Sequence, residues 1–100
     1  GDAAVEAGVF FESVNFAVLK KLPVLFVCEN NLYSVYSPLR VRQPEGRSIA
    51  KMVEGLGLPA HGGDGNDATE VYRMASAALA VPIQAVFFLP FVNSTAEELL

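Results

Sequence analysis

An aspartate at the start of the chain and a pair of asparagines further along have the types and spacing that point most directly to chemistry. The sequence opens with Gly1-Asp2 and reaches Asn30-Asn31 about 28 positions later. Carboxylate and carboxamide oxygens are hard ligands that suit a divalent cation. A cation held beside the positive end of a helix dipole would also bind the phosphate that it neutralises. These residues therefore predict a cation and phosphate site.

The segment between them is expected to bring both ends of this site together. Residues 4–20 contain no proline and one interior glycine, which predicts a helix of roughly 25 Å. Pro23 ends such a helix, and the run PVLFVCE that starts there predicts a buried strand of roughly 20 Å. If another strand precedes the chain, Asp2 and Asn31 lie at the carboxyl edge of a parallel sheet. Open α/β folds bind ligands at that edge.

A longer stretch of sequence resembles a known family. GDAAVEAGVFFESVNFAVLKKLPVLFVCENNLYSVYSPLRVRQP is similar to the alpha subunit of the thiamine-dependent first component of 2-oxo acid dehydrogenase complexes, of the pyruvate, branched-chain and acetoin type. The GD and NN pairs resemble its thiamine diphosphate motif, and ENN with a tyrosine two places on is typical of the group. The resemblance is dense to about Leu79 and fails from Val81.

The resemblance implies a parallel-sheet α/β fold that binds thiamine diphosphate and is incomplete in this chain. Residues 1–80 would be a partial binding core, and residues 81–100 a divergent C-terminal segment. We expect a strand at 83–89 and a helix starting between Ser94 and Glu97.

The resemblance also assigns roles to individual residues. Mg²⁺ would be held by Asp2, Asn31 and the backbone carbonyl of Tyr33, and the same three residues with Ala3 and Ala4 would bind thiamine diphosphate. No catalytic residue is expected here, because the family's activating glutamate lies in a beta-type domain. The usual glycine after the motif aspartate is Ala3 in this chain, and its Cβ could crowd the diphosphate or the turn.

Two functions follow as alternatives. In the first, the chain binds diphosphate and Mg²⁺ in an enzyme that oxidatively decarboxylates a small 2-oxo acid and passes the acyl group to a lipoyl group. Its partners would be a beta-type subunit or domain, in a two-alpha two-beta assembly, and a lipoyl-bearing acyltransferase. It would work in the cytoplasm, or in the mitochondrial matrix of a eukaryote. In the second, the chain is a truncated or degenerate relative that keeps only its fold and subunit contacts.

Composition limits the other possibilities. The chain is 52% hydrophobic and only 18% charged, which is more apolar than an ordinary soluble domain. No apolar run reaches the roughly 18 residues that a membrane helix requires. We therefore expect a piece of a larger body, with a first helix that is apolar almost all round and covered on several sides. A net charge of −4 argues against nucleic acid as a partner.

Three residues outside the motif have chemically reactive or metal-binding side chains but favour structural roles. Cys28 lies mid-strand, so we expect a buried thiol in a reducing compartment rather than a nucleophile. His61 is the only histidine and cannot form a multi-histidine metal site. Glu12 is expected to make a polar contact at a subunit interface.

Gly8, within the first predicted helix, would allow another helix or the cofactor to approach closely.

The remaining segments predict further elements. After the asparagines, residues 32–48 indicate a long surface loop. Its three arginines would either lie on a solvated face or meet phosphate or carboxylate groups: Arg40, Arg42 and Arg47.

Two capped helices should follow this loop. Ser48 would cap a helix over residues 49–56. The segment GGDGND predicts a turn whose glycines supply positive φ, with Asp67 and Glu70 forming the capping box of the next helix.

Overall fold

The computed structural model describes residues 1–34, 37–80 and 86–91. Three strands form a parallel sheet in the order β1-β5-β4. Their bounds are Leu25–Val27 for β1, Val86–Phe91 for β5 and Ala60–Asp64 for β4. The predicted α/β class is therefore confirmed.

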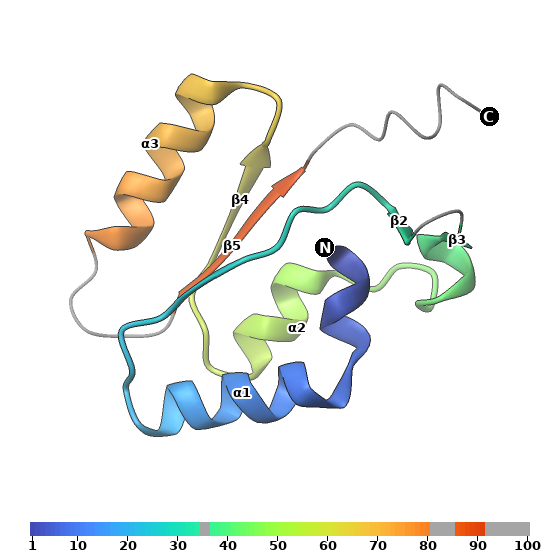
Figure 1. Cartoon of the computed structure of the whole chain (residues 1–100), viewed down its shortest axis with the longest axis horizontal. Helices are drawn as coiled ribbons and strands as arrows, with labels where there is room; N and C mark the ends of the chain where they lie inside the picture. Colours follow the sequence, from blue (N-terminus) through green and yellow to red (C-terminus); the bar gives the residue numbers. More distant parts are fainter. Residues whose placement is uncertain (35–36, 81–85, 92–100) are drawn as a thin grey trace.

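Helices cover both faces of this sheet. Helix α3 (Ala68–Leu79) lies on one side of β4 and β5, whereas α1 (Gly8–Leu19) and α2 (Ile49–Gly55) lie on the other (Figure 1). Among the described residues, no helix is both long enough and apolar enough to cross a membrane.

Two predicted strands, the edge strand β1 and the central strand β5, are present with different limits. Strand β1 occupies the middle of the run predicted at 23–29, and β5 pairs with it in the register Leu25↔Val86. Strand β5 overlaps the strand predicted at 83–89 but continues through Pro90 to Phe91. Residues 83–85 and the helix start predicted between Ser94 and Glu97 lie outside the described residues.

The first predicted helix is wrong as a single element, because it divides into two pieces. A five-residue 3-10 helix, η1 (Asp2–Glu6), comes first, and Ala7 is extended at φ −77° and ψ 141° before α1 begins. Gly8 follows this break and is a poor helix former. Figure 1 shows the two pieces meeting at an angle. The motif aspartate therefore lies on a short helix and not on the long helix whose dipole was predicted to assist it.

Helix α1 ends at Leu19, before Pro23, the residue that was expected to end it. Lys21 takes the left-handed conformation at φ 53°, and the Leu22 amide donates to the Ala17 carbonyl at 2.9 Å. This arrangement satisfies the last carbonyls of a helix in the way that a C-terminal glycine usually does. Gly57 plays the same part for α2, at φ 97°.

The main core lies between the sheet and the layer formed by η1, α1 and α2. Phe10 of α1 packs edge-to-face against Phe26 of β1, with ring centroids 6.2 Å apart. The fully buried members of this core are Val5, Val14, Ala17, Cys28, Ile49, Val53 and Leu58.

The outer face of α1 is not covered by the described residues. Val9, Phe16 and Leu19 are all exposed there, although a helix with this composition was expected to be covered on several sides. Glu12 is exposed as well. A Cβ added at Gly8 would meet nothing within 4 Å, so the close approach expected at this glycine is absent from the described part of the chain.

The long loop predicted after the asparagines contains regular structure. An antiparallel hairpin joins β2 (Tyr33–Ser34) to β3 (Ser37–Pro38), and the 3-10 helix η2 (Leu39–Val41) follows directly. The sequence gives little sign of it, because each strand is only two residues long. Helix α2 then starts as predicted, with the Ser48 hydroxyl accepting from the Lys51 amide.

The glycine-rich segment is divided between strand β4 and the predicted turn, which is limited to Gly65 and Asn66. Strand β4 includes Gly62 and Gly63, and neither has a positive φ. A Cβ at Gly63 would lie 2.5 Å from the sulfur of Met74, so this glycine allows α3 to approach the sheet closely.

The predicted cap of α3 is half right. Asp67 caps the helix by accepting from the Thr69 and Glu70 amides. The Glu70 carboxylate pairs with Arg73 instead of completing a capping box.

Gly63→Ala should lower the free energy of unfolding by about 1 kcal/mol or less, because the new methyl group meets the flexible end of Met74, which must move aside. The matched control is Gly55→Ala, where a Cβ meets nothing within 4 Å. That change should be neutral or stabilising by up to about 1 kcal/mol. Urea unfolding of the two variants measures both effects, and equal shifts would contradict the proposed close approach.

Candidate functional site

The motif aspartate is at the centre of a buried ionic cluster. Its Oδ2 atom lies 2.8 Å from Nη2 of Arg42, and the Asp2 side chain is 0% exposed. Arg42 also donates through Nη1 to both carboxylate oxygens of Glu6, at 2.9 and 3.2 Å. Gln43 donates through Nε2 to Glu6 Oε1 at 3.3 Å. Four side chains that are up to 41 positions apart thus meet in one network.

Three polar atoms in this cluster are buried and make no hydrogen bond within the described part of the chain: Asp2 Oδ1, Arg42 Nε and Gln43 Oε1. Buried polar atoms are nearly always paired in folded proteins, with protein, water or a bound group. Because these three atoms belong to one cluster, we expect water, a bound group or another protein chain to supply their hydrogen-bond partners. Asp2 Oδ1 is an acceptor of the kind that a hard cation prefers.

The asparagine pair follows strand β1 at the carboxyl edge of the sheet, as predicted. Asn30 Oδ1 accepts from the Leu32 amide at 3.2 Å, and Leu32 takes a left-handed backbone at φ 68°. That conformation costs a residue other than glycine about 1–2 kcal/mol. Strain of this size tends to persist at functional sites, where the surroundings hold it. Asn31, the predicted ligand, is half-buried beside this turn.

The other predicted site residues lie near the same place. Helix η1 lies against strand β2, which brings the backbone of Tyr33 close to the element that carries Asp2. Ala3 and Ala4 belong to η1, and neither has a positive φ. The Ala3 side chain therefore does not crowd the turn, since this turn does not require glycine, whereas crowding of the diphosphate stays a prediction.

Cys28 lies at the same edge and is buried, as expected. Burial raises the pKa of its thiol from the ordinary 9.0 to about 11.

The three loop arginines divide between the two predicted alternatives. Arg42 is not on a solvated face, because its side chain is only 13% exposed and is paired with two carboxylates. Arg40 and Arg47 are exposed, as expected for a loop surface.

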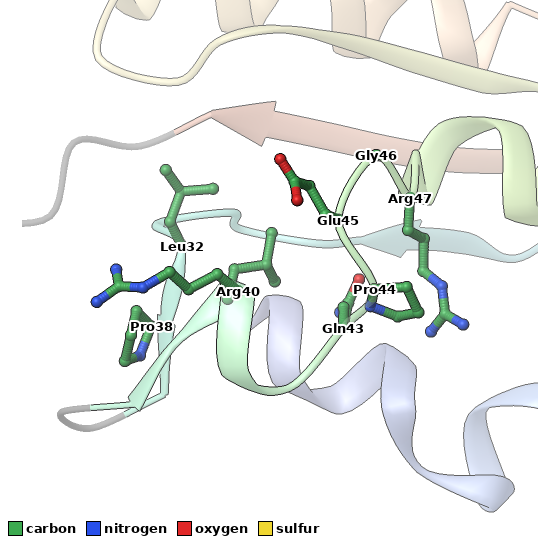
Figure 2. A pocket seen from close by; sticks show the side chains of 9 residues that line it. Leu32, Pro38, Arg40, Gln43, Pro44, Glu45, Gly46 and Arg47 are labelled. Carbon is green, nitrogen blue, oxygen red and sulfur yellow. The ribbon is translucent and has the colours of Figure 1, made fainter.

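A pocket of about 370 Å³ adjoins the cluster (Figure 2). It is lined by the turn at Leu32, strand β3, helix η2 and the loop before α2, with Arg40 and Arg47 among its residues. Gln43 belongs to both the pocket and the ionic cluster. Figure 2 shows the oxygen of its side chain on the side where Glu45 lies. The pocket therefore gives the cluster a neighbouring open space.

Two members of the cluster were missed by sequence reasoning. Glu6 was treated as one of the few polar residues of a helix, and Gln43 as part of a loop. The contacts of Glu6 with Arg42 and Gln43 span 36 and 37 positions, so no local spacing links these residues. Nothing in one sequence indicates such a pairing.

The donor set of this edge suits Mg²⁺ better than a transition metal. Among the described residues, no group of three or more His, Cys, Asp and Glu side chains could hold a metal ion. Mg²⁺ is usually held by one or two carboxylates together with other oxygen ligands, often from a bound phosphate. Asp2 Oδ1, a carboxylate oxygen without a hydrogen-bond partner in the described residues, lies on η1, which packs against the strand that carries Tyr33, and this fits that pattern.

Comparison with known proteins identifies relatives along most of the chain. The family described as the dehydrogenase E1 component matches residues 1–82, which include both halves of the motif. The 2-oxoisovalerate dehydrogenase subunit alpha of Bacillus subtilis is 38% identical over 78 residues, covering 78% of this chain and 23% of that protein. The pyruvate dehydrogenase E1 component subunit alpha of Staphylococcus aureus strain Mu50 is 36% identical over 78 residues, covering 78% and 21%. The chain thus spans about a fifth of the length of the curated relatives it matches.

Cys28 should react slowly with thiol reagents in the folded protein. A pKa of about 11 leaves roughly 100-fold less thiolate at pH 8 than a pKa of 9.0 does, and burial also restricts access. Iodoacetamide labelling, followed by mass spectrometry, should therefore be at least about 100-fold slower in the native protein than in urea. Comparable rates would contradict the buried position at the site edge.

Proposed function

The chain belongs to the dehydrogenase E1 component family, as its motif predicted, and from this we propose that it binds Mg²⁺ and thiamine diphosphate in a 2-oxo acid dehydrogenase. Residues 1–80 would form part of a thiamine diphosphate-binding fold. The observation that carries the proposal is Asp2 Oδ1, a buried carboxylate oxygen without a hydrogen-bond partner in the described residues.

The proposed ligands come from two segments at one edge of the sheet. Asp2 would offer Oδ1, because Arg42 already occupies Oδ2. Asn31 and the Tyr33 carbonyl would add oxygens from the strained turn that Asn30 holds. The backbone at Ala3 and Ala4 would face the diphosphate. The ordinary backbone of η1 supports this, because it accommodates alanine without strain.

When bound, thiamine diphosphate supplies the chemistry that decarboxylates a 2-oxo acid. The residues of this chain would bind and orient it rather than transfer protons. Ligands that are buried and hydrogen-bonded hold a cation in one geometry, and this fixes the phosphate group that the cation binds. Burial of Asp2 also keeps bulk water from competing for its free oxygen.

The other components of the reaction would come from partners. The relatives are named as alpha subunits. We propose a beta-type subunit or domain that supplies the activating glutamate, and a lipoyl-bearing acyltransferase that accepts the acyl group. The exposed apolar face of α1 supports a larger assembly, because Val9, Phe16 and Leu19 are uncovered together.

A non-catalytic relative is the second candidate. The ion pair between Asp2 and Arg42 favours it, since Arg42 gives the buried carboxylate a counter-charge without any metal. In that case the motif aspartate would serve packing alone.

Asp2→Asn separates the two candidates, because it removes the ligand charge while keeping the size of the side chain. We expect thiamine diphosphate affinity to fall by more than about 100-fold, since loss of a ligand should exceed the 10–100-fold effect of outer-shell changes. Isothermal titration calorimetry of the natural protein, purified with any partner chain it holds, measures this affinity with Mg²⁺ or with EDTA.

The matched control is Asp64→Asn. Asp64 is an exposed aspartate at the end of β4, and the same change there should leave the affinity unaltered. Binding that does not depend on Mg²⁺, or equal affinities in wild type and Asp2→Asn, would refute the proposed role and favour the non-catalytic relative.

A further inference from the structure

We propose that Arg42 is a positioning residue, which fixes the Asp2 carboxylate so that Oδ1 faces a divalent cation. This inference rests on the proposed function, because it assumes that Asp2 binds a cation. Arg42 lies in the loop after the asparagines and is not one of the predicted ligands.

The geometry of the ion pair leaves one oxygen of Asp2 for the cation. Arg42 Nη2 contacts Oδ2 alone, at 2.8 Å, and Oδ1 makes no hydrogen bond in the described part of the chain. The guanidinium is planar and its donors have fixed directions, so one contact sets the orientation of the carboxylate. Metal-ligating carboxylates are commonly held by hydrogen bonds of this kind.

The charges of the cluster are incomplete without a cation. Asp2 and Glu6 contribute −2 and Arg42 contributes +1, so the sum is −1. The Glu6 side chain is 24% exposed, so this excess charge is only partly buried, and its partial burial without a counter-charge is unfavourable. A cation at Oδ1 would compensate this charge while Arg42 stays in place.

Arg42 is also connected to the asparagine pair by a series of hydrogen bonds. Asn30 Oδ1 accepts from the Leu32 amide, and the Leu32 carbonyl accepts from the Leu39 amide at 2.7 Å. The Leu39 carbonyl in turn accepts from the Arg42 amide at 3.0 Å. The backbone that carries Arg42 is therefore linked to the turn beside Asn31, so Arg42 connects the two segments that supply the proposed ligands.

Glu6 and Gln43 hold the other side of the guanidinium. Glu6 receives both contacts of Nη1, and Gln43 adds a hydrogen bond to the same carboxylate. With both ends engaged, the guanidinium cannot turn away from Asp2 without breaking several bonds. This arrangement favours a fixed support over an arginine that leaves when the cation enters.

Binding of Mn²⁺, which prefers the same oxygen ligands as Mg²⁺, tests the proposal in the natural protein with any partner chain it holds. Free Mn²⁺ is measured by electron paramagnetic resonance in the presence of thiamine diphosphate. Arg42→Met should weaken Mn²⁺ binding by about 10–100-fold. Arg42→Lys keeps the charge and one donor, so it should restore part of the affinity.

The matched control is Arg73→Met, which removes another arginine paired with a carboxylate at 2.9 Å, in α3 on the other side of the sheet. Its Mn²⁺ affinity should equal that of wild type. Glu6→Gln removes the charge that holds Nη1 and should weaken Mn²⁺ binding less than Arg42→Met does. Glu6→Gln and Arg42→Lys carry the test if Arg42→Met does not fold.

A second measurement separates positioning from a purely structural role. A cation that binds only the folded state raises the unfolding temperature, and at a given concentration the rise grows with the logarithm of its affinity. At a Mn²⁺ concentration that saturates the wild-type protein, we expect a smaller rise in unfolding temperature for Arg42→Met than for wild type. A variant that lowers the metal-free unfolding temperature but keeps the whole rise would overturn the proposal.

Two further outcomes are decisive. The positioning role would be overturned if Arg42→Met, or both Arg42→Lys and Glu6→Gln, bound Mn²⁺ as tightly as wild type or more tightly. Arg42 would then either have no effect on the cation or compete with it for Asp2. If wild type binds no Mn²⁺, the proposed function fails, and the inference that rests on it fails as well.

Discussion

A buried carboxylate needs a partner, and the way this chain satisfies Asp2 shapes much of its first half. The side chain is fully enclosed, and an arginine 40 positions away provides its counter-charge. To reach Asp2, the segment after the asparagines must fold back over η1, and the hairpin of β2 and β3 together with η2 accomplishes this. An ion pair in such a place contributes little net stability when desolvation is counted. Its loss would nevertheless leave a charge buried alone.

The position of Asp2 depends on the interruption between η1 and α1. A continuous helix from the start of the chain would carry the aspartate along the axis of α1. The extended backbone at Ala7 lets η1 turn instead, so that Val5 enters the core while Asp2 faces Arg42. The parallel sheet supplies the second fixed point, because β1 ends just before the asparagines. Two rigid elements thus converge on one edge.

Two features of this chain point to binding partners. Within the described residues, three polar atoms are buried at the sheet edge without hydrogen-bond partners, and apolar side chains are exposed along α1. A cation and phosphate would complete the first, and another protein surface would cover the second. Both features agree with the family to which the chain belongs, since its members matched here are described as subunits and are several times longer.

The sequence alone determined the features that depend on neighbouring residues. The caps at Ser48 and Asp67 and the end of α2 at Gly57 were predictable, because their hydrogen bonds join residues within about one turn of helix. The two halves of the motif and the edge after β1 were predictable from element lengths. The tertiary structure decided the rest. The pairing of Asp2 with Arg42, the part played by Glu6 and the tight approach at Gly63 all join segments that are far apart along the chain or in different elements. Such contacts depend on how whole elements pack, which no short spacing in a single sequence encodes.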